Sequence, residues 1–98
     1  MNGITKVSDI TNTDLAEYLR LDEVSEDDLA MLNVMLGVAK QFIISYTGRT
    51  DLDEFQDFVI AVFVLVQDMW DNRTMYVDKL NLNKVVQAIL GMHAVNLL

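Results

Sequence analysis

The chain has 98 residues, of which 52% are apolar and 22% charged, and its fifteen acidic and seven basic residues give a formal net charge of −8. This length fits one domain. The acidic excess argues against a nucleic-acid-binding protein, which needs clustered lysine and arginine to neutralise phosphates. The absence of cysteine excludes disulfide scaffolds and thiolate metal sites.

The apolar content exceeds what one small core usually hides. The longest unbroken apolar run, Phe58–Val66, falls well short of the roughly 20 residues that span a bilayer. We therefore expect no membrane segment, and we expect part of the apolar surface to contact a partner protein.

Two helices are predicted by their start and stop signals. Thr11 and Asp14 have the spacing of a capping box, which indicates a short first helix that ends near Leu21. Ser25 precedes three acidic residues, 26–28, which favour the positive end of a helix dipole. Gly48 is a typical left-handed C-cap, so we expect a long second helix between these signals.

The predicted second helix has two apolar faces. One stripe has the three- and four-residue spacing of a packed helix and consists of Leu29, Leu32, Leu36, Ala39, Ile43 and Tyr46. A second stripe, about 100° round the helix, consists of Met31, Met35, Val38 and Phe42. Val34, Ile44 and Ala30 lie away from both stripes. Because residues 29–48 carry Lys40 as their only charge, we expect this helix to be surrounded by more protein than its own chain supplies.

The third and fourth helices are predicted from weaker signals. Asp51 and Glu54 suggest a capping box that opens a helix over 55–73. The β-branched run 58–66 fits a buried strand as well as a helix, but the helical spacing continues outside it, which favours a helix. Asn81 or Asn83 can cap a short last helix, expected to end at Gly91.

These elements predict an all-α fold, a small bundle of about four helices with two long central helices and a flexible carboxy-terminal tail. Residues 1–98 form a single domain, with 1–10 and 92–98 expected as extended tails. No internal repeat or low-complexity linker is evident.

The residues give little support to catalysis. His93 is the only histidine and has no cysteine or nearby serine to activate, so a structural or interface histidine is expected. Asp51 and Asp53 resemble the start of a calcium loop, but this register places Gln56 and Val62 where glycine and a bidentate acid are needed. We expect no enzyme activity, no metal and no cofactor.

Several landmarks occur in an order that resembles a known family. They are Glu17–Arg20 before an acidic turn, Ser25–Leu29 opening a long helix, Ala39–Ile43 and Tyr46–Arg49 closing it, and Trp70–Arg73 ending the third helix. In this order they resemble the small head-tail connector (adaptor, or head-completion) proteins of long-tailed double-stranded-DNA bacteriophages and prophages.

The resemblance implies a non-enzymatic structural protein of the virion, assembled in the host cytoplasm and involved in DNA packaging. Members of the family form a homo-oligomeric ring under the portal protein, extend the DNA channel and dock the next head-completion or tail-side component. DNA would pass through the ring without specific binding. The alternative is a small soluble helical regulator or chaperone-like adaptor that binds a partner helix in a methionine-rich groove.

These expectations assign residues to three surfaces. The subunit interface is predicted to contain Val34, Met35, Val38, Phe42, Ile44, Phe63 and Trp70. The portal contact is predicted at Val95, Leu97 and Leu98, which would add an extended strand or an apolar plug. The candidate channel-facing acids are Asp22, Glu23, Glu26 and Asp27, which would repel passing phosphates.

Overall fold

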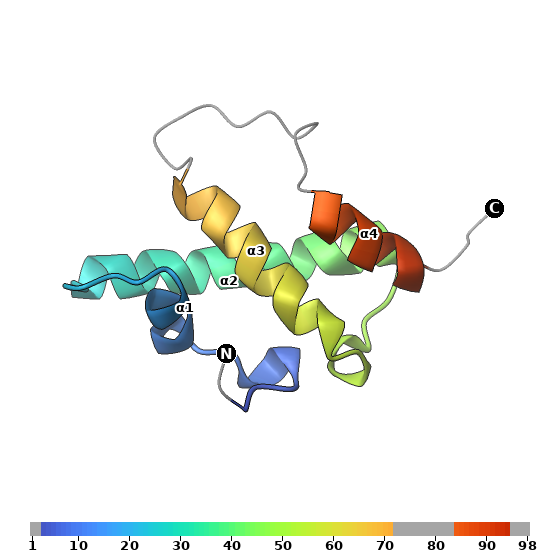
Figure 1. The fold of residues 1–98 in the computed structure, drawn as a ribbon, viewed down its shortest axis with the longest axis horizontal. Coiled ribbons are helices and arrows are strands. Elements are labelled where there is room, and N and C mark those ends of the chain that lie inside the picture. The colour runs from blue at the N-terminus through green and yellow to red at the C-terminus, as the bar shows by residue number, and fades with distance from the viewer. Residues whose placement is uncertain (1–2, 72–83, 95–98) are drawn as a thin grey trace.

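The chain folds as a helical bundle. The computed structural model describes residues 3–71 and 84–94, which form four α-helices and two short 3-10 turns without a strand (Figure 1). The helices are α1 (Asn12–Tyr18), α2 (Glu26–Thr47), α3 (Asp57–Asp71) and α4 (Lys84–His93), and the turns are η1 (Val7–Asp9) and η2 (Leu52–Glu54). The predicted all-α class is confirmed.

The starts of α1 and α2 match their sequence signals. The Thr11 hydroxyl accepts a hydrogen bond from the Asp14 amide, and the Asp14 carboxylate accepts one from the Thr11 amide. Ser25 and Asp28 form the same reciprocal pair at the start of α2. At the other end of α2, Gly48 has a φ of 72°, the left-handed conformation that favours glycine. Both capping boxes and the glycine stop are confirmed.

The predicted start of α3 is wrong. Asp51 makes no side-chain cap, and residues 52–54 form the separate turn η2 instead. Phe55 is extended, with φ −125° and ψ 108°, and α3 begins at Asp57. Leu52, the first residue of this turn, is buried in the core. The choice of helix over strand for 58–66 is confirmed.

The predicted end of α4 is also wrong. The helix continues through Gly91 to His93, and Gly91 is not among the glycines with positive φ. The extra residues are held by contacts of His93 with Arg49, which follows α2, and with Asp57, the first residue of α3. The candidate caps Asn81 and Asn83, and the predicted third-helix end at Arg73, lie outside the described residues.

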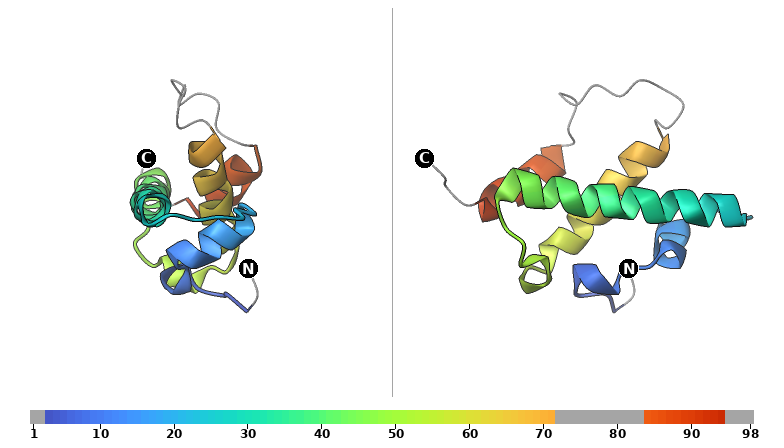
Figure 2. Two further views of the ribbon diagram at one scale, coloured as in Figure 1. Left: turned by 90° about the vertical axis from the view of Figure 1, so that its left-hand side faces the viewer. Right: turned by 180° about the vertical axis from the view of Figure 1, so that it is seen from behind.

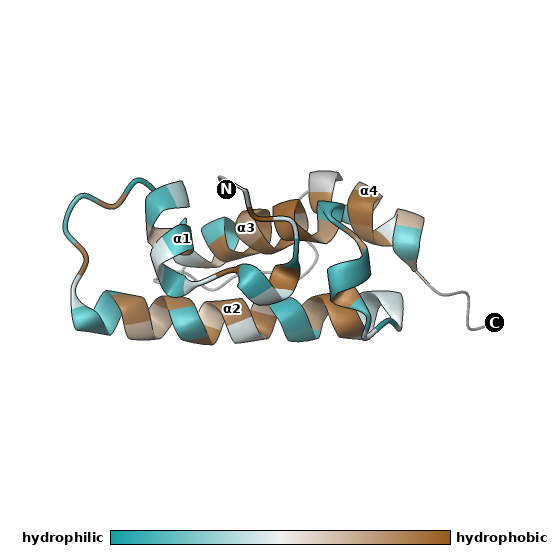
Figure 3. Cartoon of the chain, turned by 90° about the horizontal axis from the view of Figure 1, so that it is seen from below, coloured by the Kyte–Doolittle hydropathy of each residue, from teal (hydrophilic) through white to brown (hydrophobic). Residues whose placement is uncertain are grey.

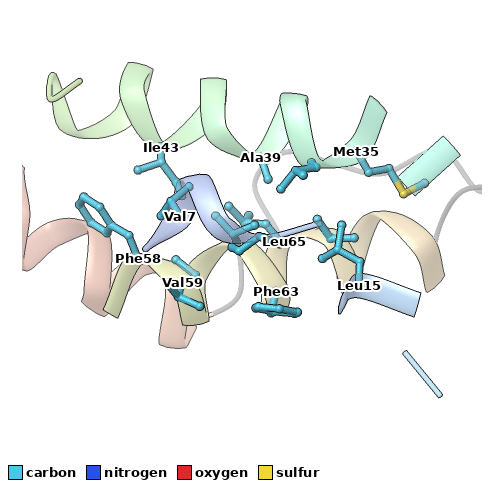
Figure 4. Packing of buried hydrophobic residues seen from close by; sticks show 14 of the residues in the cluster. Val7, Leu15, Met35, Ala39, Ile43, Phe58, Val59, Phe63 and Leu65 are labelled. Atoms are coloured by element: carbon cyan, nitrogen blue, oxygen red, sulfur yellow. The ribbon is translucent and has the colours of Figure 1, made fainter. Parts of the chain in front are cut away.

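The helices form two layers around one core. Helix α2 lies along one side of the molecule, and α1, α3, α4 and the amino-terminal turn lie on the other (Figures 2 and 3). Met35, Ala39 and Ile43 point from α2 toward residues of the second layer such as Leu15 and Leu65 (Figure 4). The core thus fills the space between α2 and the second layer.

Part of each expected tail is folded. Val7 and Ile10 are buried in the core, so the segment 1–10 is not a free extended tail from Val7 onward. Met92 and His93 belong to α4. The rest of the predicted carboxy-terminal tail, 95–98, lies outside the described residues.

Candidate functional site

The outer face of α2 is the largest concentration of exposed apolar side chains in the described part of the chain. It consists of Met31, Val34, Val38, Phe42 and Tyr46. Val34 and Val38 are 62% and 51% exposed, and the rings of Phe42 and Tyr46 stack with centroids 5.9 Å apart. These side chains recur every three or four residues and so form one strip along the helix.

The strip is separate from the buried side of α2. The inner stripe of Leu32, Leu36, Ala39 and Ile43 is buried, and at 3.6 residues per turn the strip is centred about 120° round the helix from it. The other elements pack on the inner side of α2, as Figure 3 shows. Nothing in the described residues therefore covers the strip.

The strip also lacks charge. Lys40, the only charged residue of 29–48, lies roughly 180° from Met31 round the helix. An exposed helix face normally carries charged and polar residues, which keep the protein soluble and prevent association with other molecules. An uncharged strip can lose its water at little electrostatic cost, which is what a protein contact requires.

The structure brings together part of the predicted subunit interface. Val34, Val38 and Phe42 lie in the exposed strip, while Ile44 is half-buried against the core. The other three predicted residues, Met35, Phe63 and Trp70, are buried in the chain's own core. Their side chains already pack within the same copy, so they offer little surface to a second one.

The carboxy-terminal end of the described chain is held by a cluster that we call the clasp: Arg49, Phe55, Asp57, Phe58 and His93. His93 Nε2 makes a hydrogen bond of 2.7 Å with Asp57 Oδ2. The centroid of the His93 ring lies 4.2 Å from the ring centroid of Phe55 and 4.9 Å from that of Phe58. Arg49 Nε donates to the His93 carbonyl, and the Arg49 guanidinium lies 4.9 Å above the Phe55 ring. His93 therefore has structural contacts that join α4 to the start of α3.

The clasp and the candidate channel-facing acids lie at opposite ends of the molecule. The acids Asp22, Glu23, Glu26 and Asp27 are exposed at or before the start of α2. The clasp lies beyond the end of the same helix, about 33 Å away at 1.5 Å per residue. The chain toward 95–98 leaves the described structure at this second end (Figure 1). The predicted portal residues Val95, Leu97 and Leu98 are themselves outside the described residues.

Two acidic side chains have perturbed pKa values, and neither is a candidate channel residue. Hydrogen bonding from Ser8 lowers the pKa of Asp53, whose Oδ1 accepts from the Ser8 amide at 2.9 Å. Desolvation by partial burial, followed by the charge of Asp71, raises the pKa of Asp68. Asp53 joins η2 to η1, whereas Asp68 and Asp71 belong to the same helix, α3. Within the described residues no group of histidine and acidic side chains could hold a metal ion.

Comparison with known proteins adds no assignment. No family model, curated protein or solved structure matches the chain. Helix α2 is long and apolar enough to cross a membrane by length and composition alone, a test that core helices of soluble proteins also pass. The function must therefore be inferred from the surface of α2 and its surroundings.

Two features were missed by the sequence reasoning. Tyr46 was assigned to the buried stripe but belongs to the outer face. A shallow apolar groove of about 390 Å³ lies between the amino-terminal segment and the start of α3, and we call it the Ile60 groove; its lining residues are Ile4, Gln56, Asp57, Val59 and Ile60. Ile4 and the other lining residues are at least 52 positions apart in sequence, so no local pattern could have indicated the groove.

Proposed function

We propose that the chain is a non-enzymatic structural subunit that assembles with copies of itself into a ring at the portal vertex of a phage or prophage particle. The ring docks under the portal protein, extends the DNA channel and joins the capsid to the next head-completion or tail component. The single observation that supports this most is the uncovered, uncharged outer face of α2. The order of sequence landmarks shared with head-tail connectors supplies the biological setting.

The distribution of charge supports a second copy, rather than a charged partner, on this face. Every copy carries −8, so contact between two copies is least opposed where the surfaces carry little acid. The outer face meets this condition over about four turns of helix, from Met31 to Tyr46. A basic partner would instead favour the acidic start of α2.

The opposite placement of the acids and the chain end suits a connector. In our proposal the segment 95–98 reaches the portal from the clasp end, and the acids Asp22, Glu23, Glu26 and Asp27 line the channel. Carboxylates on the channel wall would repel DNA phosphates and let DNA pass without binding.

The test is the oligomeric state of the purified protein, alone and mixed with the portal protein of the same particle, by light scattering and negative-stain imaging. We expect rings, at least with portal. A Val34→Asp/Val38→Asp variant should lose them, because a charge would be buried without a partner at each contact. The matched control is Asn33→Asp, which adds a charge to an exposed position on the opposite arc of the same helix and should assemble normally.

Three results would contradict the proposal. The wild-type protein could stay monomeric under both conditions, or it could bind one partner helix as a monomer, which would favour the adaptor alternative. It could also float with lipid vesicles instead of self-associating, which would make the outer face of α2 a membrane-binding surface.

A further inference from the structure

The outer face of α2 alone would join two copies only weakly. Met31 to Tyr46 covers about 22 Å of helix and roughly one helix diameter of about 10 Å. A stable pair of proteins buries about 800 Å² on each partner. A twofold pair of α2 strips would remain well below that area and would leave any second apolar surface exposed.

The Ile60 groove is a second apolar surface. Ile60 is 42% exposed, and Val59 and Ile4 complete an apolar floor beside it. The one charged lining residue, Asp57, is partly paired, because its Oδ2 makes a hydrogen bond with His93. Gln56 at the rim can exchange hydrogen bonds with a tyrosine hydroxyl such as that of Tyr46.

The two surfaces belong to opposite layers. Figure 3 shows α2 along one side of the molecule and the amino-terminal segment with α3 on the other. A twofold axis can join two different patches reciprocally only where the patches lie side by side on one face. A contact between two different patches on different layers is head to tail, and repeated from copy to copy it closes into a ring where the rotation between copies allows it.

We infer that the outer face of α2 of one copy docks into the Ile60 groove of the next. The inference rests on the proposed function and names the contact that would build the ring. Each copy then buries both surfaces, and closure holds every copy by two contacts instead of one. The strip supplies a ridge of side chains at helical spacing, and the groove supplies a hollow of matching chemistry.

The decisive experiment mixes two variants that each lack one surface. Val34→Asp/Val38→Asp removes the strip, and Ile60→Asp removes the groove. Both changes are at exposed positions and should leave folding close to wild type, which circular dichroism checks. Each variant alone should be monomeric. An equimolar mixture should form a weak complex of two chains and nothing larger, detected by sedimentation at high protein concentration, because one intact strip meets one intact groove.

Other outcomes overturn the inference. A mixture that stays monomeric, while the wild type assembles, would show that these two surfaces do not meet. An Ile60→Asp variant that assembles like the wild type would indicate strip-to-strip pairing, and the proposed ring function would survive this. A wild type that assembles under no condition would instead remove the proposed function itself.

A crosslinking test covers the case in which an aspartate variant fails to fold. The chain has no cysteine, so introduced thiols react alone. A variant with Val38→Cys and Ile60→Cys should give a ladder of linked chains with a short bismaleimide. The Val38→Cys variant alone should give no linked pair, and a strong pair would overturn the head-to-tail contact.

Discussion

Removal of the His93 side chain should weaken the fold measurably, since the clasp connects α4 to the rest of the chain. His93→Ala deletes the hydrogen bond to Asp57, which is worth about 1 kcal/mol at a partly buried site. It also deletes two ring contacts, with Phe55 and Phe58, each worth roughly 0.5 kcal/mol or more. The bond from Arg49 survives because it goes to the backbone carbonyl.

The expected loss is therefore about 2 kcal/mol of unfolding free energy, which in a domain of this size lowers Tm by roughly 8–16 °C. Urea and thermal unfolding followed by circular dichroism measure both quantities. The matched control is Met92→Ala, the neighbouring residue, which is 73% exposed and should change stability by less than about 0.5 kcal/mol.

A double-mutant cycle with Asp57→Ala separates the hydrogen bond from the ring contacts. Asp57 also lies in the first turn of α3, where its charge favours the helix dipole, so the single variant overstates the bond. The coupling energy in the cycle should be about 1 kcal/mol. Hydrogen exchange should rise in α4 before α2, because a helix of ten residues is marginal when undocked. A His93→Ala variant that is no more destabilised than Met92→Ala would show that the side chain of His93 does not hold α4 in place.

Three further predictions concern backbone, pH and salt. Gly37→Ala should stabilise the protein by about 0.5–1 kcal/mol, since Gly37 is inside α2 and an added Cβ meets nothing within 4 Å. Gly48→Ala should destabilise the protein, because Gly48 has a φ of 72°. Urea unfolding of both variants measures the contrast. The lowered pKa of Asp53 means that its bond from Ser8 stabilises the fold above the unfolded pKa of 3.8 and that this contribution is lost as pH falls through the folded value. Asp53→Ala should therefore cost stability at pH 7 and little at pH 2 or below, as unfolding at the two pH values would show. Ring assembly should strengthen as salt rises, because salt screens the repulsion between acidic copies and leaves the apolar contact intact. Sedimentation at about 0.01 M and about 1 M salt tests this, since the Debye length falls from about 30 to about 3 Å between these concentrations.

The parts of the fold that could be predicted from sequence are those set by near neighbours. The capping boxes at Thr11 and Ser25 link residues three positions apart, and Gly48 ends its helix through its own backbone preference. The start of α3 depended on packing of Leu52 and on the contact between Ser8 and Asp53, which are 45 positions apart. No window of sequence contains both partners of that contact.

The same distinction explains the predicted interface residues. Val34, Val38 and Phe42, which were predicted at the subunit interface, are exposed in the single copy. Phe63 and Met35, predicted at the same interface, are buried: α3 is apolar on nearly every side and α2 on two, so the packing partners decide which arc is covered. Periodicity shows that a helix has apolar faces but not which of them its own chain fills.

The separation of charge from the outer face of α2 follows from how the helix begins. Glu26, Asp27 and Asp28 occupy its first turn, where they favour the dipole and, through Asp28, complete the capping box with Ser25. Acid that stabilises the helix is thereby confined to one end, and the four turns that follow are free to be apolar. In a head-to-tail ring this end contributes repulsion between copies without entering their contact. Substituting Asp28 to reduce the repulsion would remove the capping box of the helix that carries the contact, so at this position the repulsion between copies and the integrity of their interface depend on the same residue.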